Sequence, residues 1–462
     1  MRGLFHFLGL IISSTLLSFN LIMGFSFFVS YLYFFIRNRN LGSRLSKVNI
    51  SFVFLVGFIV SDLISLVILN AFGYEDVKTI FFQGVCLVFI ILYCINERDL
   101  LYQLRFSFLL FALIAFLGLI REQNITAVIA YIKSFWLLPI ICFQILYGQY
   151  KISLFQIFVI ITLFAISIIM IVIQNSVGFE NYFIGLGIDK FYASRGISTL
   201  GEIPIGFVVY DPINDEYGSR PFGVFLSPDK MAYLAGVACC LVFSRFINGK
   251  SRLTTIAMIL TCMFFTIPFH VKTFSLFFVV VAYVLCLQFF LKVTSFHKLF
   301  FLTLIPFSVS IYAVTHFVPA SVLSSSGAIQ HLWGLLNPIY NSSVFSIEFW
   351  LGNGLGAGGT VGRVYADNEL ASKADVGGES FIGSTFYQIG FYGVALIYYI
   401  YSKVNILALN RLKSESYPIF SASLLGIMFS MSMSEAFVSF FQSACLGLCL
   451  LSFTKFKSNI NK

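Results

Sequence analysis

The segment "ISLFQIFVIITLFAISIIMIVI" at residues 152–173 decides the fold, because its 22 residues include no charged side chain. A helix needs about 20 predominantly apolar residues to cross the hydrocarbon core of a bilayer. The rest of the chain continues this pattern: of its 462 residues, 59% are hydrophobic and only 11% are charged. No soluble core requires so much apolar surface, so the sequence predicts a polytopic membrane protein.

Similar apolar runs recur along the whole chain. We predict membrane spans near 4–19, 21–36, 50–72, 79–95, 104–120, 125–147, 152–173, 228–247, 253–269, 273–291, 299–318, 380–402, 417–434 and 436–453. The first two form one long tilted helix if the weak break around Phe19 does not separate them, so the count is 14 helices, or 13 after merging. We therefore expect an all-α transmembrane bundle that forms a single integral membrane domain over 1–462.

The charges predict how the bundle is oriented. The segment "RNRNLGSRLSK" (37–47) carries four basic residues, and short basic loops stay in the cytoplasm. Alternating sides from there puts 19 of the 29 Lys and Arg residues inside and 16 of the 20 acidic residues outside. Both termini are then cytoplasmic. Topology explains the net charge of +9, and we expect no nucleic-acid partner.

Two long loops, 174–227 and 319–379, fall on the predicted outer side, whereas the other loops are short. This asymmetry suggests work done at the outer face. The nine cysteines all fall in predicted helices and the five histidines are scattered, so no metal site or other cofactor is expected. The run "GLGAGG" (354–359) satisfies G-x-G-x-x-G, but it follows no predicted strand and indicates no dinucleotide site.

The stretch "SRPFGVFLSPDK" (219–230) concentrates polar chemistry where the first long loop meets a helix. Pro228 suits the first helical position, and the apolar segment before it is expected to be flexible at Gly223. Arg220 and Lys230 then lie near a helix N-terminus, which favours anions. The alternative is that both basic side chains simply extend into the membrane interface.

A second cluster of basic residues lies in "IPFHVKTFSLFF" (267–278), where two helices meet in a short outer turn. Lys272 and His270 stand there although positive charge is disfavoured outside, so Lys272 is a candidate contact for an anion. A turn lysine that faces water is the alternative. Other basic residues predicted on the outer side include Lys133, Arg195 and Arg363.

An acidic residue opens the helix that follows the second long loop. In "GGESFIGSTFYQIGFYGV" (377–394), Glu379 and Ser380 stand behind a Gly-Gly pair at the start of a membrane helix. Glu379 either complements the positive helix end or places a carboxylate at the membrane surface beside the basic residues.

Together these segments resemble the bacterial O-antigen polymerases (Wzy-type), relatives of the O-antigen ligases. "RPFGVFLSPDKMAYLAG" (220–236) is similar to the family's Arg-x-x-Gly, then Pro-Asn or Pro-Asp, then a small-residue helix start. "FHVKTFSLFFVV" (269–280) resembles its short basic outer turn, "FWLGNGLGAGG" (349–359) its Gly-x-Gly-x-Gly, and "ESFIGSTFYQIGFYGV" (379–394) its helix ending in Gly-x-x-Gly.

The sequence departs from the family at two positions. Lys272 stands where Arg is more typical, and Glu379 stands where ligases carry a His before this helix. The missing His favours a polymerase over a ligase and speaks against an imidazole-dependent mechanism.

The resemblance implies a bundle similar to GT-C-type glycosyltransferases in a bacterial inner membrane. Such an enzyme transfers a glycan from undecaprenyl pyrophosphate to a hydroxyl of another lipid-linked repeat unit at the periplasmic face. Its implied partners are the lipid-linked units, membrane lipid and a chain-length regulator. Arg220, Lys272 and Glu379 would be catalytic; the implied substrate-binding residues are Arg195, Lys230, Lys133, Arg363, His270 and Ser380.

Two other functions stay open at this point. One is an O-antigen ligase, and the other is a lipid-linked oligosaccharide flippase or related transporter. Charge inside the predicted helices is essentially confined to Asp62 and Lys133, whereas a transporter would spread charge through the helix interiors.

Reporter fusions at Asn248 and Gly327 test the predicted orientation. We expect the fusion at Asn248 to report a cytoplasmic position and the fusion at Gly327 an external one, because basic loops remain inside. The same compartment for both fusions would contradict the topology and the function that depends on it.

Overall fold

The computed structural model of the chain describes residues 105, 109, 112, 125–148, 152, 154–189, 199–200, 203–204, 208–211, 216–223, 225, 227–246, 252–266, 271–319, 328–359, 379–434 and 440–457. The spans predicted at 4–19, 21–36, 50–72 and 79–95 lie outside the described residues, and the span at 104–120 is described at three helical positions alone. The count of 14 helices therefore stays a prediction.

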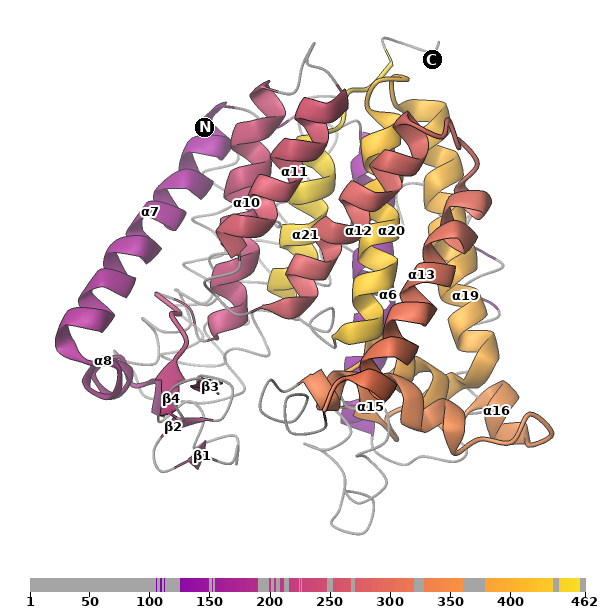
Figure 1. Cartoon of the computed structure of the whole chain (residues 1–462), viewed down its shortest axis with the longest axis horizontal. Helices are drawn as coiled ribbons and strands as arrows, with labels where there is room; N and C mark the ends of the chain where they lie inside the picture. The colour runs from indigo at the N-terminus through magenta and orange to yellow at the C-terminus, as the bar shows by residue number, and fades with distance from the viewer. Residues whose placement is uncertain are drawn as a thin grey trace, which may run out of the picture.

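Nine of the helices in the described residues match predicted spans, and they run roughly side by side (Figure 1). They are α6 (Ile125–Gly148), α7 (Leu154–Val177), α10 (Pro228–Phe246), α11 (Arg252–Thr266), α12 (Lys272–Phe289), α13 (Phe296–Phe317), α19 (Phe381–Arg411), α20 (Tyr417–Ser430) and α21 (Phe440–Ser452). A short 3-10 helix, η4 (Met431–Met433), continues α20. Within the described residues, three segments are long and apolar enough to cross a membrane: Ile157–Val177, Phe296–Phe317 and Phe381–Arg411.

The two long loops fold at the same end of the bundle (Figure 1). The first contains α8 (Phe179–Gly185) and two antiparallel hairpins, β1 (Thr199–Leu200) with β2 (Ile203–Pro204) and β3 (Val208–Asp211) with β4 (Glu216–Ser219). The second contains α15 (Ala328–Tyr340) and α16 (Ile347–Leu351). The bundle in the described residues is all-helical, as predicted, and the first loop adds two short hairpins, where valine and tyrosine favour the paired strands β3 and β4.

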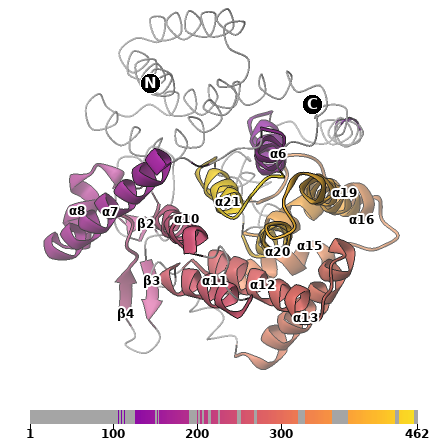
Figure 2. The same cartoon turned by 90° about the horizontal axis from the view of Figure 1, so that it is seen from above.

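The core lies among the central helices, with α20 between α12 and α19 (Figure 2). Every residue from Ile419 to Ser430 is buried, as expected of a helix that is apolar on all sides. By contrast, α7 exposes large apolar side chains such as Ile169 and Val172. A helix with such a face can lie against lipid.

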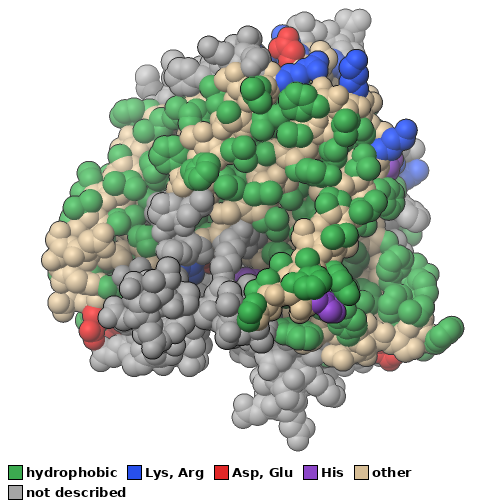
Figure 3. All heavy atoms as spheres, in the orientation of Figure 1, with side chains coloured by type: hydrophobic (Ala, Val, Ile, Leu, Met, Phe, Trp, Pro, Cys, Tyr) green, Lys and Arg blue, Asp and Glu red, His purple; other side chains and the backbone are tan. Residues whose placement is uncertain are grey.

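Basic side chains gather at the end of the bundle opposite the long loops (Figure 3). Lys292 follows α12 there, Lys413 follows α19, and the backbone N–H of Lys413 donates to the carbonyl of Lys455 in the C-terminal segment. The positive-inside rule assigns such an end to the cytoplasm. The orientation of the bundle in the membrane stays a prediction.

The packing of α10 against α12 depends on Gly236. A Cβ added at Gly236 would lie 2.0 Å from the ring of Phe274, which is itself buried and stacked on Tyr233. We expect Gly236→Ala to lower the free energy of unfolding by about 1–3 kcal/mol, because the ring has no room to move. Thermal unfolding in detergent measures this loss.

Gly185→Ala is the matched control, since a Cβ there meets nothing within 4 Å. It should leave the unfolding temperature unchanged or raise it slightly. Equal unfolding temperatures for the two variants would show that α10 and α12 do not pack as described.

Candidate functional site

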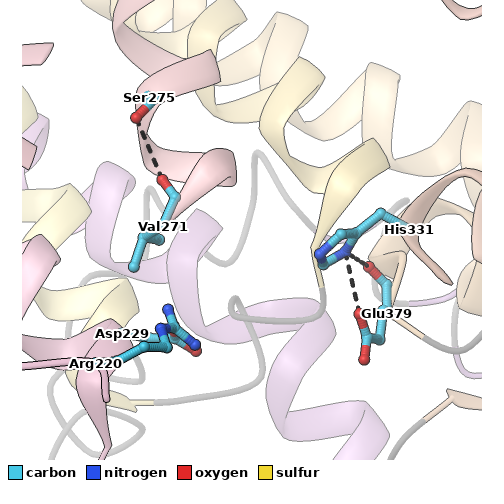
Figure 4. A network of polar contacts seen from close by, with 6 residues as sticks. All are labelled: Arg220, Asp229, Val271, Ser275, His331 and Glu379. Atoms are coloured by element: carbon cyan, nitrogen blue, oxygen red, sulfur yellow. Dashed lines mark hydrogen bonds and ion pairs between the residues drawn. The ribbon is translucent and has the colours of Figure 1, made fainter. Parts of the chain in front are cut away.

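Arg220 forms an ion pair with Asp229 at the start of α10 (Figure 4). The guanidinium Nη2 donates to the carboxylate Oδ1 at 2.7 Å. The Arg220 side chain is only 13% exposed, whereas that of Asp229 is 40% exposed. The sequence placed Arg220 at the start of this helix but did not identify Asp229 as its partner. The carboxylate holds the guanidinium in a defined orientation.

Aromatic packing fixes the chain just after Arg220. Phe222 is fully buried, and its ring contacts those of Phe179, Tyr182 and Phe183 on α8 at centroid distances of 5.7, 5.4 and 6.3 Å. The backbone N–H of Phe222 also donates to the Gln174 side chain at 3.4 Å. The end of α7 and the short helix α8 therefore position the segment that carries Arg220.

Gly223 is a fixed turn, which corrects the expectation that the chain is flexible there. Its φ is +60°, and an added Cβ would lie 2.8 Å from the backbone oxygen of Ser167 on α7. The hydroxyl of Tyr182 donates to the Gly223 carbonyl at 2.9 Å. Glycine is thus needed for close approach and for its positive φ, and the turn is held from both sides.

Lys272 is the first residue of α12, and its side chain lies outside the described ones. The preceding residue, Val271, appears in the same close view as the Arg220–Asp229 pair (Figure 4). Tyr233 on α10 stacks on Phe274 on α12 at a centroid distance of 4.4 Å. The two helices therefore pack together near their starts, as a convergence of Arg220 and Lys272 requires.

Lys230 faces α21. Its ammonium lies 5.7 Å from the ring centroid of Phe441, and that ring also packs edge-on against Phe225. A cation at this distance from an aromatic face is attracted to it.

Glu379 at the start of α19 meets His331 from α15 (Figure 4). The imidazole Nδ1 lies 3.4 Å from the carboxylate Oε2 and 3.3 Å from the carbonyl oxygen of Glu379. Glu379 has a φ of +63°, a left-handed conformation that is uncommon outside glycine. Such a residue persists only where its surroundings hold it, and these positions often belong to functional sites.

Backbone contact between α15 and α19 brings His331 to Glu379. A Cβ added at Gly383 would lie 1.9 Å from the carbonyl oxygen of Gly334. Gly334 stands one helical turn after His331 on α15, and Gly383 stands four residues after Glu379, which lies just before the N-cap of α19. Ser380 is buried and caps α19, because its hydroxyl oxygen accepts from the Gly383 N–H at 2.9 Å.

The glycine-rich segment after α16 braces a break in α19. Gly390 is non-helical, with φ 70° and ψ −165°. The N–H groups of Asn353 and Gly354 donate to the carbonyls of Tyr387 and Gln388 at 2.8 and 3.1 Å. The buried Gln388 side chain accepts from the Gly356 N–H at 2.7 Å. The sequence gave no role to "GLGAGG" beyond excluding a dinucleotide site, whereas in the structure the segment supports the helix that follows Glu379.

The side chains of the other predicted site residues lie outside the part of the chain that the structure describes. Arg195, His270 and Arg363 lie outside the described residues, and Lys133 lies within α6 with its side chain outside them. In the part of the chain that the structure describes, no three His, Cys, Asp or Glu side chains gather as a metal ion would require. His331 was not predicted as a site residue, because its spacing from the other histidines indicates no metal site and nothing in the sequence pairs it with Glu379, 48 residues away.

The hydroxyl of Tyr182 makes the stability of the first loop depend on pH. Burial raises the pKa of Tyr182 to about 12, above the usual value near 10. The folded state therefore favours the neutral phenol, so this stabilisation is complete below about pH 10 and is lost as the pH rises towards 12. We expect Tyr182→Phe to be less stable at pH 8 by about 1 kcal/mol, because the hydrogen bond to Gly223 is lost.

The same variant should lose less of its unfolding temperature than the wild type between pH 10 and 12. Thermal unfolding at a series of pH values measures this difference. Tyr340→Phe is the control, because that ring is exposed, and it should follow the wild-type curve. Parallel curves for Tyr182→Phe and the wild type would contradict the assignment.

No protein-family model matches the chain, and no curated protein matches it either. The candidate site is therefore defined by its own geometry. Two pairs of side chains stand at the starts of long helices: Arg220 of the first long loop with Asp229 at α10, and His331 with Glu379 of the second long loop before α19 (Figure 4).

Proposed function

We propose that the protein is a polysaccharide polymerase of the outer leaflet of a bacterial inner membrane. It transfers a glycan from undecaprenyl pyrophosphate to a hydroxyl of another lipid-linked repeat unit. The observation that carries the proposal is the presence of two side-chain pairs at the loop end of the bundle, the Arg220–Asp229 ion pair at the start of α10 and the His331–Glu379 pair before α19. One pair offers a cation, and the other offers a carboxylate with an imidazole.

The cationic side suits the leaving group. Departure of a sugar from a lipid pyrophosphate leaves negative charge on the pyrophosphate, and fixed positive groups in a water-restricted place stabilise that charge. The Arg220 guanidinium is mostly shielded from solvent and is oriented by Asp229. Arg suits bidentate phosphate contact, and Lys272 adds a point charge at the neighbouring start of α12.

The acidic side suits the acceptor. The Glu379 side chain is 40% exposed and that of His331 is 26% exposed, so a sugar hydroxyl can reach both. Glu379 serves either to activate the hydroxyl or to position the sugar. The glycine-rich brace holds α19 at Tyr387 and Gln388, within the helix that follows Glu379, and a well-supported scaffold suits such a site.

An O-antigen ligase is the second candidate function. His331 supports it, because an imidazole stands beside Glu379 where the sequence alone indicated none. Deletion in the native host distinguishes the two functions. Surface lipid capped by a single repeat unit would indicate a polymerase, whereas full-length polymer that is not attached to the surface lipid would indicate a ligase.

Alanine variants of the two basic residues test the pyrophosphate assignment. We expect Arg220→Ala and Lys272→Ala each to remove most long-chain polysaccharide at normal protein levels. Losing one charge-assisted contact to the leaving group costs about 2–4 kcal/mol of transition-state stabilisation, or about 30- to 1000-fold in rate. Lys272→Arg should retain part of the activity. Gel analysis of surface polysaccharide in a deletion host measures the outcome.

Lys413→Ala is the control, because that side chain is exposed and lies after the opposite end of α19. It should leave the polysaccharide unchanged. Near-normal polymer from both Arg220→Ala and Lys272→Ala would remove these residues from the reaction.

A further inference from the structure

We infer that His331 accepts the proton of the acceptor hydroxyl and that Glu379 positions its imidazole. The inference rests on the proposed function and deepens it, because it assigns separate roles to the two members of the pair. It also differs from the expectation from sequence, in which Glu379 was catalytic and the missing His spoke against an imidazole-dependent mechanism.

The contacts of Nδ1 determine where the imidazole carries its proton. Nδ1 faces the carbonyl oxygen of Glu379 at 3.3 Å and the carboxylate Oε2 at 3.4 Å. A carbonyl oxygen only accepts hydrogen bonds, and so does an ionised carboxylate. Nδ1 must therefore carry the hydrogen, which leaves Nε2 of the neutral ring as an acceptor. An imidazole held in this tautomer is ready to take a proton.

The position of the pair is set by several independent contacts. Gly334 and Gly383 leave no space between α15 and α19, so the helix that carries His331 cannot slide. The backbone N–H of Phe381 donates to the carbonyl of Ser434 at 3.1 Å, which fixes the residues next to Glu379. The left-handed conformation of Glu379 then directs its carbonyl and its carboxylate to one imidazole nitrogen.

The chemistry favours the imidazole over the carboxylate as the base. Histidine is the side chain that most often serves as a general base, and a neutral ring with one unprotonated nitrogen can take a proton directly. A carboxylate on Nδ1 orients the ring and stabilises the imidazolium that forms. Glu379 meets this second requirement as placed, with its Oε2 on the Nδ1 side of the ring.

The transfer step balances with these groups. The acceptor hydroxyl oxygen forms a bond to the anomeric carbon of the donor sugar, while the bond from that carbon to the pyrophosphate oxygen breaks. The bonding electron pair leaves with the pyrophosphate, next to the cationic side of the site. The hydroxyl proton moves to Nε2 of His331, and the imidazolium later returns it to water.

Two substitutions of His331 separate a base from a structural contact. The amide nitrogen of His331→Asn falls near the place of Nδ1 and keeps the donor to Glu379, but the variant lacks Nε2. His331→Gln reaches towards the place of Nε2 but lacks the Nδ1 donor, and neither amide is a base. We expect both variants to lower the turnover rate about 100-fold or more with little change in KM for the lipid-linked units.

The matched control is His316→Asn. The Nδ1 of His316 also contacts a backbone carbonyl, that of Tyr312 at 2.9 Å, but His316 is exposed near the end of α13. This variant should keep wild-type turnover. Glu379→Gln retains an oxygen that can accept from Nδ1, so we expect a loss of about 10-fold, smaller than that of either His331 variant.

The assay uses full-length protein in lipid vesicles with lipid-linked repeat units extracted from the native host, and turnover is expressed per folded molecule from thermal unfolding. A wild type that forms no polymer would defeat the proposed function itself. A wild type that polymerises, with His331→Asn within twofold of it, would overturn the inference and leave His331 a structural contact. If His331→Asn does not fold, His331→Gln decides by the same threshold.

Discussion

The site depends on one constraint, that backbone groups inside a membrane protein must find partners within the protein. The break at Gly390 releases carbonyls of α19, and the N–H groups of Asn353 and Gly354 satisfy two of them. A Cβ at Gly390 would lie 2.3 Å from the Trp350 carbonyl carbon. Only glycine at position 390 therefore allows α16 and the segment after it to pack against the break in α19. The second long loop is therefore part of the helix that presents Glu379.

The first long loop solves the corresponding problem with aromatic burial. Phe222 packs among the rings of α8, and the Tyr182 hydroxyl fixes the Gly223 carbonyl, so Arg220 approaches α10 from a rigid support. Asp229 then compensates the charge of a guanidinium that is mostly removed from water, which lowers the cost of placing it there. Each loop thus delivers a charged group to a helix start by a different physical means.

Much of the described helical framework could be predicted from the sequence, because hydropathy reports directly on segments that avoid water. The start of α10 at Pro228 followed from local capping chemistry in the same way. Partners could not be predicted. His331 and Glu379 are 48 residues apart and meet only because Gly334 and Gly383 bring two backbones together. Neither apolar periodicity nor motif spacing reports such a contact, and the hairpin β3–β4 escaped notice because its strands are four residues each.

Because α15 packs closely on α19, the His331–Glu379 contact depends on the rotation of α15 about its own axis as well as on its residues. Each residue added to an α-helix turns everything beyond it by about 100°. One alanine inserted between His331 and Gly334 would retain every side chain of the pair, yet it would rotate the imidazole away from Glu379 while the glycine contact stayed in place. The contact of His331 with Glu379 therefore depends on the spacing of two residues between His331 and Gly334.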